Sequence, residues 1–298
     1  MNKYVKEPSI YHSYKVICNI TETAESIPEW SMGMDSPLAN FGYNVLQTIN
    51  KYEVLNKKNL EFCVNLKNPS KWKTDNLTNV LRSLRKSGYI NSIGLKPIEE
   101  AVTYSITLYT LTAKANNLLQ ENGITPHHKA ITSFTEEAVD RLLSKASINQ
   151  WHIGLIRNYK ASLKESKYCG YTIKGNVSVP SVIRIKNIKR TKKELLAIYS
   201  FPAPKNKSEI KDFLLKIITL QSVIVERKNE IGFIIAVCEN MPHACWIASY
   251  VNKFRQTRPF YVVYAHDMAT VRDNPLENMF LCEAEEIGIK QTSLNLLK

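Results

Sequence analysis

Two short runs of almost uninterrupted apolar residues in the C-terminal half constrain the fold more than any other feature of the chain. They are IGFIIAVC, residues 231–238, and FYVVY within PFYVVYAHD, residues 259–267, and the helical pattern HACWIASYVNKF lies between them. A strand that is apolar on both sides is typical of a sheet covered on both faces. The patterns from residue 176 onward predict the order β-β-α-β-α-β, so we expect residues 150–298 to form an α/β domain.

The N-terminal half instead spaces its apolar residues as helices do. SPLANFGYNVLQTINKY predicts a first helix, LNKKNLEFCVNL a second, and DNLTNVLRSLRK a third from about residue 75 to 87 that ends before Gly88. Alternating residues then predict a hairpin with arms at 89–93 and 102–110, joined by a loop that holds Gly94, Lys96 and Pro97. A fourth helix is expected after Thr112, with Thr112 as its cap and Gly123 as its end.

The order helix, helix, helix, hairpin, helix over residues 36–123 resembles a winged helix-turn-helix. The stretch LTNVLRSLRKSGYI followed by TYSITLYTLTAKANNLL resembles the recognition helix, hairpin and next helix of MarR-like winged-helix DNA-binding domains. The resemblance implies an α+β domain whose third helix enters the major groove of double-stranded DNA.

Polar residues of the third helix are the candidates for DNA contact. By the resemblance, Asn79, Arg82 and Lys86 would read base edges, because arginine pairs well with guanine and asparagine with adenine. The candidates for phosphate contact lie near the helix start, at its edge and in the hairpin loop: Lys71, Lys73, Thr74, Thr78, Arg85 and Lys96. Glu99 and Glu100 in that loop favour the alternative, a winged helix that contacts protein rather than DNA.

The net charge of +13 is unevenly distributed along the chain. Residues 36–125 hold 11 Lys and Arg against 6 Asp and Glu, and residues 150–230 hold 17 against 6. Such an excess favours a polyanionic partner, since binding releases counterions from a phosphate backbone. The larger block predicts a second basic surface made of Arg184, Lys186, Lys189, Arg190, Lys192 and Lys193. These residues would either follow a phosphate backbone or protect a sheet edge from aggregation.

An α/β domain beside a DNA-binding domain also suggests a nuclease. The PD-(D/E)xK nucleases place carboxylates and a lysine at the ends of two adjacent strands, which would be VPSVIRI and LLAIYSF in this chain. There Pro180 is followed by Ser181, and neither strand offers the carboxylates that hold a metal ion. A fold of this kind would be degenerate, so we predict no catalytic residue, no metal and no cofactor. Cys238, His243, Cys245 and His266 match the spacing of no common zinc site.

The combination resembles the replication-relaxation proteins of plasmids and other mobile elements, which join an N-terminal winged helix to a nuclease-like domain that often lacks catalytic residues. The residues that carry this resemblance are LRKSGYI…YTLTAKANNLL and His152 within NQWHIGLIRNYKASL. It implies a role in the replication or transfer of a mobile element and a replication or transfer protein as a partner.

Four regions are therefore expected: an N-terminal extension over 1–35, the winged helix over 36–123, a connecting helix over 124–149 and the α/β domain over 150–298. Ser133 and Glu136 predict a capping box at the start of the connecting helix, which could pair with a second copy in a homodimer. The N-terminus lacks the apolar core of a signal peptide, and no apolar run has the length of a membrane span, so we expect a cytoplasmic protein.

The function expected is that of a sequence-specific double-stranded DNA-binding protein, acting as a transcription regulator or as an accessory factor of a mobile element. Two alternatives stay open at this point. One is a metal-dependent nuclease, and the other is an adaptor that uses the winged helix for protein contacts.

Overall fold

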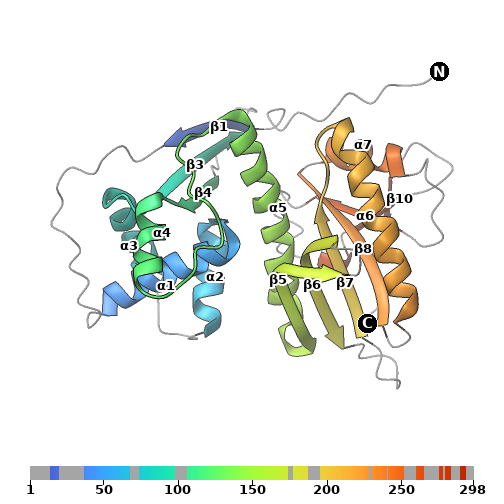
Figure 1. Ribbon diagram of the computed structural model, residues 1–298, viewed down its shortest axis with the longest axis horizontal. Coiled ribbons are helices and arrows are strands. Elements are labelled where there is room, and N and C mark those ends of the chain that lie inside the picture. The colour runs from blue at the N-terminus through green and yellow to red at the C-terminus, as the bar shows by residue number, and fades with distance from the viewer. Residues whose placement is uncertain are drawn as a thin grey trace. The chain divides into compact units, whose positions relative to one another are not determined.

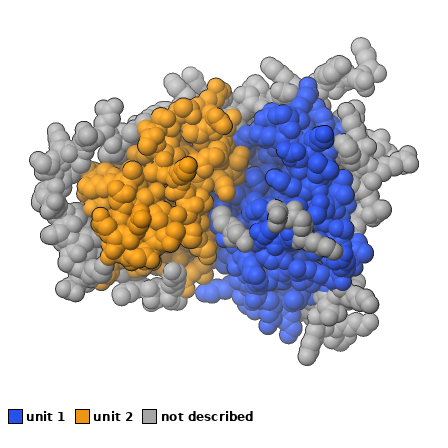
Figure 2. Space-filling view, in the orientation of Figure 1, with its two compact units in different colours: residues 1–9, 147–298 blue, residues 10–146 orange. Residues whose placement is uncertain are grey.

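The structure is a computed structural model, and it describes residues 14–19, 37–67, 74–97, 106–173, 177–186, 195–227, 230–239, 241–251, 260–264, 275–277, 279–282 and 289–292. The chain divides into two compact units, which Figures 1 and 2 show. We call residues 10–146 the N-terminal unit and residues 147–298 the C-terminal unit. Helices and sheets with mixed strand directions make up the fold, which confirms the general α+β class expected from the sequence. A helix with the length and apolar character needed to cross a membrane is absent from the described residues.

The N-terminal unit carries helices on an antiparallel sheet. Its elements in chain order are β1 (Tyr14–Asn19), α1 (Pro37–Tyr52), β2 (Val54–Asn56), α2 (Lys57–Lys67), α3 (Thr74–Lys86), β3 (Ile90–Pro97), β4 (Ile106–Leu111) and α4 (Ala113–Glu121). The strands lie in the order β1-β3-β4-β2, and each pair of neighbours is antiparallel. The predicted order of helices and hairpin is therefore present, with β1 and β2 added to it.

Local signals explain the path of the chain from α3 into the hairpin. Leu77, Val80 and Leu84 are at most 1% exposed, so the predicted apolar face of α3 is the buried one. Gly88 adopts a φ of 73°, which is the left-handed conformation that ends a helix at little cost for glycine. Thr112 caps α4 by accepting from the Ala115 amide at 3.3 Å, and its hydroxyl donates to the Gly88 carbonyl at 2.7 Å.

The hairpin and the N-terminal stretch differ from the prediction. Strand β3 continues to Pro97, so Lys96 lies in a strand and not in the loop. The additional strand β1 pairs with β3 along its length, and Lys15 stands opposite Lys96 in the register. Alternating polarity did not reveal β1, because its place depends on pairing with a strand more than 70 residues later in the chain.

The C-terminal unit is built on a mixed sheet. Its elements are β5 (Leu163–Ile173), β6 (Val177–Lys186), β7 (Leu195–Pro202), α6 (Lys207–Glu226), β8 (Glu230–Cys238), α7 (Met241–Val251), β9 (Phe260–Tyr264), β10 (Met279–Cys282) and β11 (Ile289–Thr292), with short 3-10 turns at Lys160–Ser162 and Pro275–Glu277. Among the described residues, seven strands form one sheet in the order β11-β10-β9-β8-β7-β6-β5. The pairs β7·β8 and β8·β9 are parallel, and the pairs on either side of them are antiparallel.

Helices cover both faces of this sheet. On β7, Tyr199 packs in the apolar cluster that includes Phe213 and Ile217 of α6. The next residue, Ser200, accepts a hydrogen bond from Trp151 of α5 (Glu136–Tyr159). Successive residues of a strand point to opposite faces, so α6 and α5 lie on opposite sides of the sheet. This arrangement buries the central strands on both faces, as the apolar runs in the sequence predicted.

Three local predictions need correction. The stretch expected to connect the domains and the histidine-bearing stretch form one continuous helix, α5, and residues 124–135 before it are not helical. Ser133 does not cap that helix, because it is the Thr135 hydroxyl that accepts from the Ala138 amide at 3.2 Å. Strand β5 was not predicted at all, since its sequence LKESKYCGYTI mixes polar and apolar residues without regular alternation.

Candidate functional site

The exposed side of α3 is the first candidate site. Asn79, Arg82, Arg85 and Lys86 are all exposed, while the opposite side of the helix is buried against α1 and β3. The separation follows from the sequence, because the apolar residues of TDNLTNVLRSLRK recur at helical spacing. The structure therefore brings together three cations and one amide that the sequence singled out.

A hollow opens to solvent beside this face and is lined by Lys57, Thr78, Leu81, Arg82, Arg85 and Tyr109. The Lys57 ammonium donates to the Thr78 hydroxyl at 2.7 Å, which holds the first residue of α2 against α3. None of the described residues lining the hollow is acidic. Three positive charges, a hydroxyl and a phenol around one concave surface suit an anion such as a phosphate group.

Sequence reasoning missed Lys57 and Tyr109. Lys57 belongs to the lysine pair that begins α2, and Tyr109 lies on β4 among the residues that alternate with the apolar ones. Burial raises the pKa of Tyr109, and nearby Arg85 opposes this effect, so the phenol stays protonated and can donate a hydrogen bond. Only the order of the elements, and no local pattern, could have indicated that both residues meet α3.

The other residues predicted for this site have different places. Lys71 and Lys73 lie outside the described residues, and Thr74 is the first residue of α3, with a side chain that is not described. Lys96 is exposed on β3. Among the described residues, Arg82, Arg85, Lys86 and Lys96 form no ion pair with a carboxylate within 4.0 Å, so their charges are available to a partner.

The predicted second basic surface is wrong at Arg184. Its side chain is 6% exposed and pairs with Glu230, at 2.9 Å from Nε to Oε1, and with Glu165. It also donates to the hydroxyl groups of Tyr171 at 3.2 Å and Tyr199 at 3.4 Å. Strand β6, which carries it, is interior to the sheet, so Arg184 neither lines an edge nor faces a phosphate backbone.

The rest of that surface cannot be assembled from the described residues. Lys186 is exposed at the end of β6, while Lys189, Arg190, Lys192 and Lys193 lie outside the described residues. Arg184 and Arg227 instead complete a network with Glu165, Glu230 and the two tyrosines. Burial and the Glu230 carboxylate raise the pKa of Tyr199 to about 12, so this network holds a neutral phenol between its charges.

The two strands compared with those of nucleases, β6 and β7, carry serines in a buried hydrogen-bonded cluster. Ser181 of β6 and Ser200 of β7 are partners in the antiparallel register, and both are 0% exposed. The Ser181 hydroxyl lies 2.7 Å from His152 Nδ1, and Ser166 Oγ lies 3.0 Å from His152 Nε2. Trp151 Nε1 donates to Ser200 Oγ at 2.8 Å. Both serines therefore serve the packing of α5 on the sheet, with no carboxylate beside them in these contacts.

The described residues offer no cluster of metal ligands. No three His, Cys, Asp or Glu side chains among the described residues gather closely enough to hold a metal ion. His243, one of the residues considered for zinc, has one ring nitrogen 2.7 Å from the Pro204 carbonyl and accepts the Glu239 amide on the other. Cys238 is buried at the end of β8.

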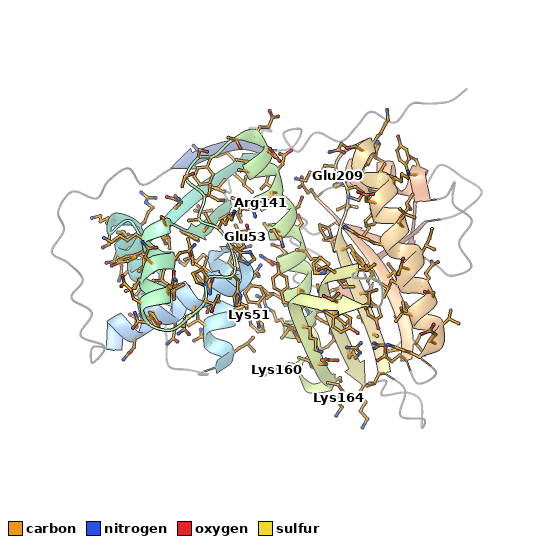
Figure 3. All side chains as sticks on the ribbon, in the orientation of Figure 1. Lys51, Glu53, Arg141, Lys160, Lys164 and Glu209 are labelled. Atoms are coloured by element: carbon orange, nitrogen blue, oxygen red, sulfur yellow. The ribbon has the colours of Figure 1, made fainter. Side chains whose placement is uncertain are left out.

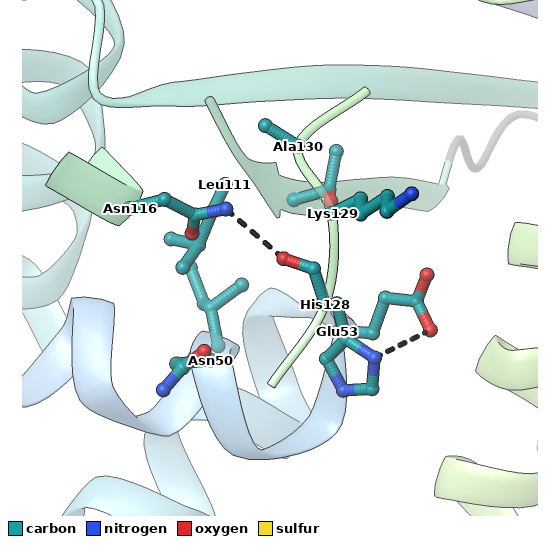
Figure 4. Close-up of a pocket in the computed structure, with 9 residues that line it drawn as sticks. Asn50, Glu53, Leu111, Asn116, His128, Lys129 and Ala130 are labelled. Carbon is teal, nitrogen blue, oxygen red and sulfur yellow. Dashed lines mark hydrogen bonds and ion pairs between the residues drawn. The ribbon is translucent and has the colours of Figure 1, made fainter. Parts of the chain in front are cut away.

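A small pocket in the N-terminal unit surrounds Glu53, the residue after α1, which has a φ of 66°. Its carboxylate is 3% exposed and lies 3.2 Å from His128 Nδ1, a contact that a dashed line marks in Figure 4. The same carboxylate pairs with Arg141 of α5, which Figure 3 labels near Glu53. Asn116 donates to the His128 carbonyl at 3.0 Å. Burial lowers the pKa of His128, although Glu53 opposes this effect. These contacts tie the segment between α4 and α5 to the end of α1, which is a structural role.

Comparison of the chain with protein-family models, with curated proteins and with solved structures found no match.

Proposed function

We propose that the N-terminal unit is a winged helix-turn-helix that binds double-stranded DNA in a sequence-specific way through α3. The observation that carries this proposal is the exposed basic face of α3, whose cations have no carboxylate partner among the described residues, beside the hollow lined by Lys57, Arg82 and Arg85. The order α1, α2, α3, β3, β4, α4 supports it, because it is the order of a winged helix. Under this proposal α3 enters the major groove, as the second helix of helix-turn-helix proteins does.

In this proposal, the residues that line the hollow bind a phosphate group of the DNA backbone. Lys57, Arg85 and Tyr109 come from three elements, so the fold holds them in place before any DNA arrives. A phosphate oxygen there would accept from an ammonium, a guanidinium and a phenol, and hydrogen bonds to charged donors are the stronger ones. Contacts of this kind fix the protein on the duplex but carry no sequence information.

In this proposal, the residues of α3 outside the hollow contact the edges of the bases. Asn79 and Lys86 are exposed and do not line it, and Arg82 reaches both surfaces. Asparagine can pair with two atoms of adenine and arginine with two atoms of guanine, which discriminates against the other bases by about 1–3 kcal/mol. Asn79 and Arg82 therefore set the sequence preference in this proposal.

The test is a salt series on duplexes selected from a random pool. Lys57→Ala and Arg85→Ala should each lower the slope of log affinity against log salt by about 0.9, with discrimination between selected and random duplex retained. Asn79→Ala should reduce that discrimination by about tenfold or more, with the slope retained. Lys216→Ala, an exposed cation of α6, is the matched control and should change neither quantity.

Two results would contradict the proposal. A random pool that yields no enriched duplex would remove the sequence-specific part. An unchanged salt slope in both Lys57→Ala and Arg85→Ala would remove the hollow from the DNA-binding surface, even if the protein binds DNA elsewhere.

For the C-terminal unit we propose a nuclease-like domain without nuclease activity. The support is that Ser181 and Ser200 face each other on two adjacent strands and are buried in hydrogen bonds with α5. Together with the DNA-binding unit, this arrangement agrees with a regulator or an accessory factor in the replication or transfer of a mobile element. Incubation of the protein with duplex and single-stranded DNA in Mg²⁺ or Mn²⁺ tests it, and metal-dependent cleavage that copurifies with the protein would refute it.

A further inference from the structure

The outer face of α6 carries an exposed apolar stripe. Among the described residues, the large apolar side chains that are strongly exposed are Leu215 at 53%, Ile218 at 50% and Val225 at 63%, and all three belong to this helix. Residues three, seven and ten positions apart share one side of a helix, so the three side chains form a single stripe. Isolated exposed apolar residues need no explanation, whereas an aligned group indicates a contact surface.

The polar residues within this stripe do not oppose its burial. The Thr219 hydroxyl donates to the Leu215 carbonyl at 2.9 Å, and the Ser222 hydroxyl donates to the Thr219 carbonyl at 2.7 Å. Both hydroxyl hydrogens are therefore used within the helix itself, as is common for serine and threonine in helices. Covering the stripe would leave neither donor without a partner, which removes the usual penalty for burying a polar group.

The charges at the two ends of the stripe identify the partner. Lys211 lies at the N-terminal end of this side of α6 and Glu226 at the C-terminal end, and both are exposed. Two copies of the helix, packed antiparallel about a twofold axis between residues 218 and 219, would set each Lys211 against Glu226 of the other copy. The same register sets Leu215 against Ser222 and Ile218 against Thr219, so two of the three large side chains each meet a small one, while Val225 stands opposite Asp212.

We propose that the α6 stripe, formed by Lys211, Leu215, Ile218, Thr219, Ser222, Val225 and Glu226, binds the same stripe of a second copy of this chain in an antiparallel, twofold-symmetric pair. A self-complementary patch is what a twofold dimer requires, since each residue pair occurs twice. Antiparallel packing also places opposite ends of the two helix dipoles together.

The size of the stripe sets the expected strength. A helix of 20 residues is about 30 Å long. A contact of that length and about 10 Å wide buries roughly 600 Å² in total, below the ~1,200 Å² of stable interfaces. The dimer should therefore dissociate in the micromolar range and be visible only in a concentration series. It requires nothing of the proposed DNA site, so the two proposals stand or fall separately.

The test is sedimentation equilibrium of the full chain up to about 200 μM, above the micromolar dissociation constant expected for so small a contact. Wild type should show a monomer–dimer equilibrium. Lys211→Glu and Glu226→Lys should each raise the dissociation constant by about tenfold, because each creates two like-charge pairs. Lys216→Glu lies on another side of α6 and is the matched control, which should dimerise as wild type does. Circular dichroism checks that each variant is folded.

Mixing the two charge-reversed variants gives the decisive result. In a heterodimer of Lys211→Glu with Glu226→Lys, one charge pair is the wild-type pair and the other is fully reversed, so both are attractive. An equimolar mixture should therefore dimerise about as well as wild type. A wild type that stays monomeric throughout the series would overturn the proposal and leave the stripe to another partner. A mixture that dimerises no better than either variant alone would overturn it as well, and so would an equal effect of Lys216→Glu.

Discussion

Acidification should destabilise the C-terminal unit through His243, near the start of α7. This residue is 2% exposed, its Nδ1 accepts from the Glu239 amide at 3.2 Å, and its Nε2 lies 2.7 Å from the Pro204 carbonyl. The two partners fix a neutral ring with its hydrogen on Nε2. A second proton on Nδ1 would point at the Glu239 amide hydrogen. Burial is the main cause that lowers the pKa of His243 to about 4, and Lys205 contributes in the same direction.

The sign and the size of the effect follow from linkage. In the unfolded chain the imidazole has a pKa of about 6.5. Between that value and the folded pKa of about 4, the unfolded state binds a proton that the folded state does not bind. Stability is therefore complete above the unfolded pKa and is lost as the pH falls to about 4. A difference of about 2.5 between the two pKa values corresponds to about 3 kcal/mol of unfolding free energy.

Urea unfolding followed by circular dichroism from about pH 8 to about pH 4 measures this loss. A His243→Gln variant keeps a donor for the Pro204 carbonyl and cannot titrate in that range. We expect wild type to lose about 3 kcal/mol more than His243→Gln across the window. His127→Gln, at an exposed histidine, is the control and should follow wild type. Parallel pH profiles of wild type and His243→Gln would refute the reasoning, because every other titrating group is common to both proteins.

Three further substitutions test the packing of both units by urea unfolding. Gly232→Ala would press its Cβ against Cγ2 of Ile224, so it should cost about 1–3 kcal/mol of unfolding free energy. In the double variant, Ile224→Ala removes the clash and should cost less than Ile224→Ala alone. Thr112→Ala removes the cap of α4 and should cost about 1 kcal/mol; a difference within error would show that the cap adds nothing. Ser200→Ala leaves the buried Trp151 N–H without its acceptor and should cost about 1–3 kcal/mol, whereas a neutral result would mean that the indole finds another.

Local sequence signals predicted the elements that depend on one segment alone. The helical spacing in TDNLTNVLRSLRK and the glycine after it define α3 to within one residue at either end. The apolar residues that recur at helical spacing from Ile210 to Leu220 define the buried side of α6. The apolar runs of β8 and β9 were recognisable because parallel central strands are buried on both faces. In each case the spacing of apolar residues and the glycine or proline residues that end an element indicated the same bounds.

Elements that depend on a distant partner could not be predicted in this way. Strand β5 ends the order of the described sheet, so several of its side chains face solvent and its sequence lacks the apolar run of an interior strand. Arg184 looked like a surface cation, but its carboxylate partners are 19 and 46 residues away in the chain. Lys57 was missed for the same reason, since its partner Thr78 lies 21 residues later in the chain.

The pairing of charges changes where a polyanion is expected to bind. The C-terminal block has the larger excess in the sequence, yet Arg184 and Arg227 are paired with Glu230, and Lys205 is paired with Glu239. A cation that already has a buried carboxylate partner gains little from a phosphate, because the existing pair would first have to break. The exposed cations of α3 have no such partner among the described residues. This difference supports our proposal that the smaller block, at the N-terminal unit, contacts DNA.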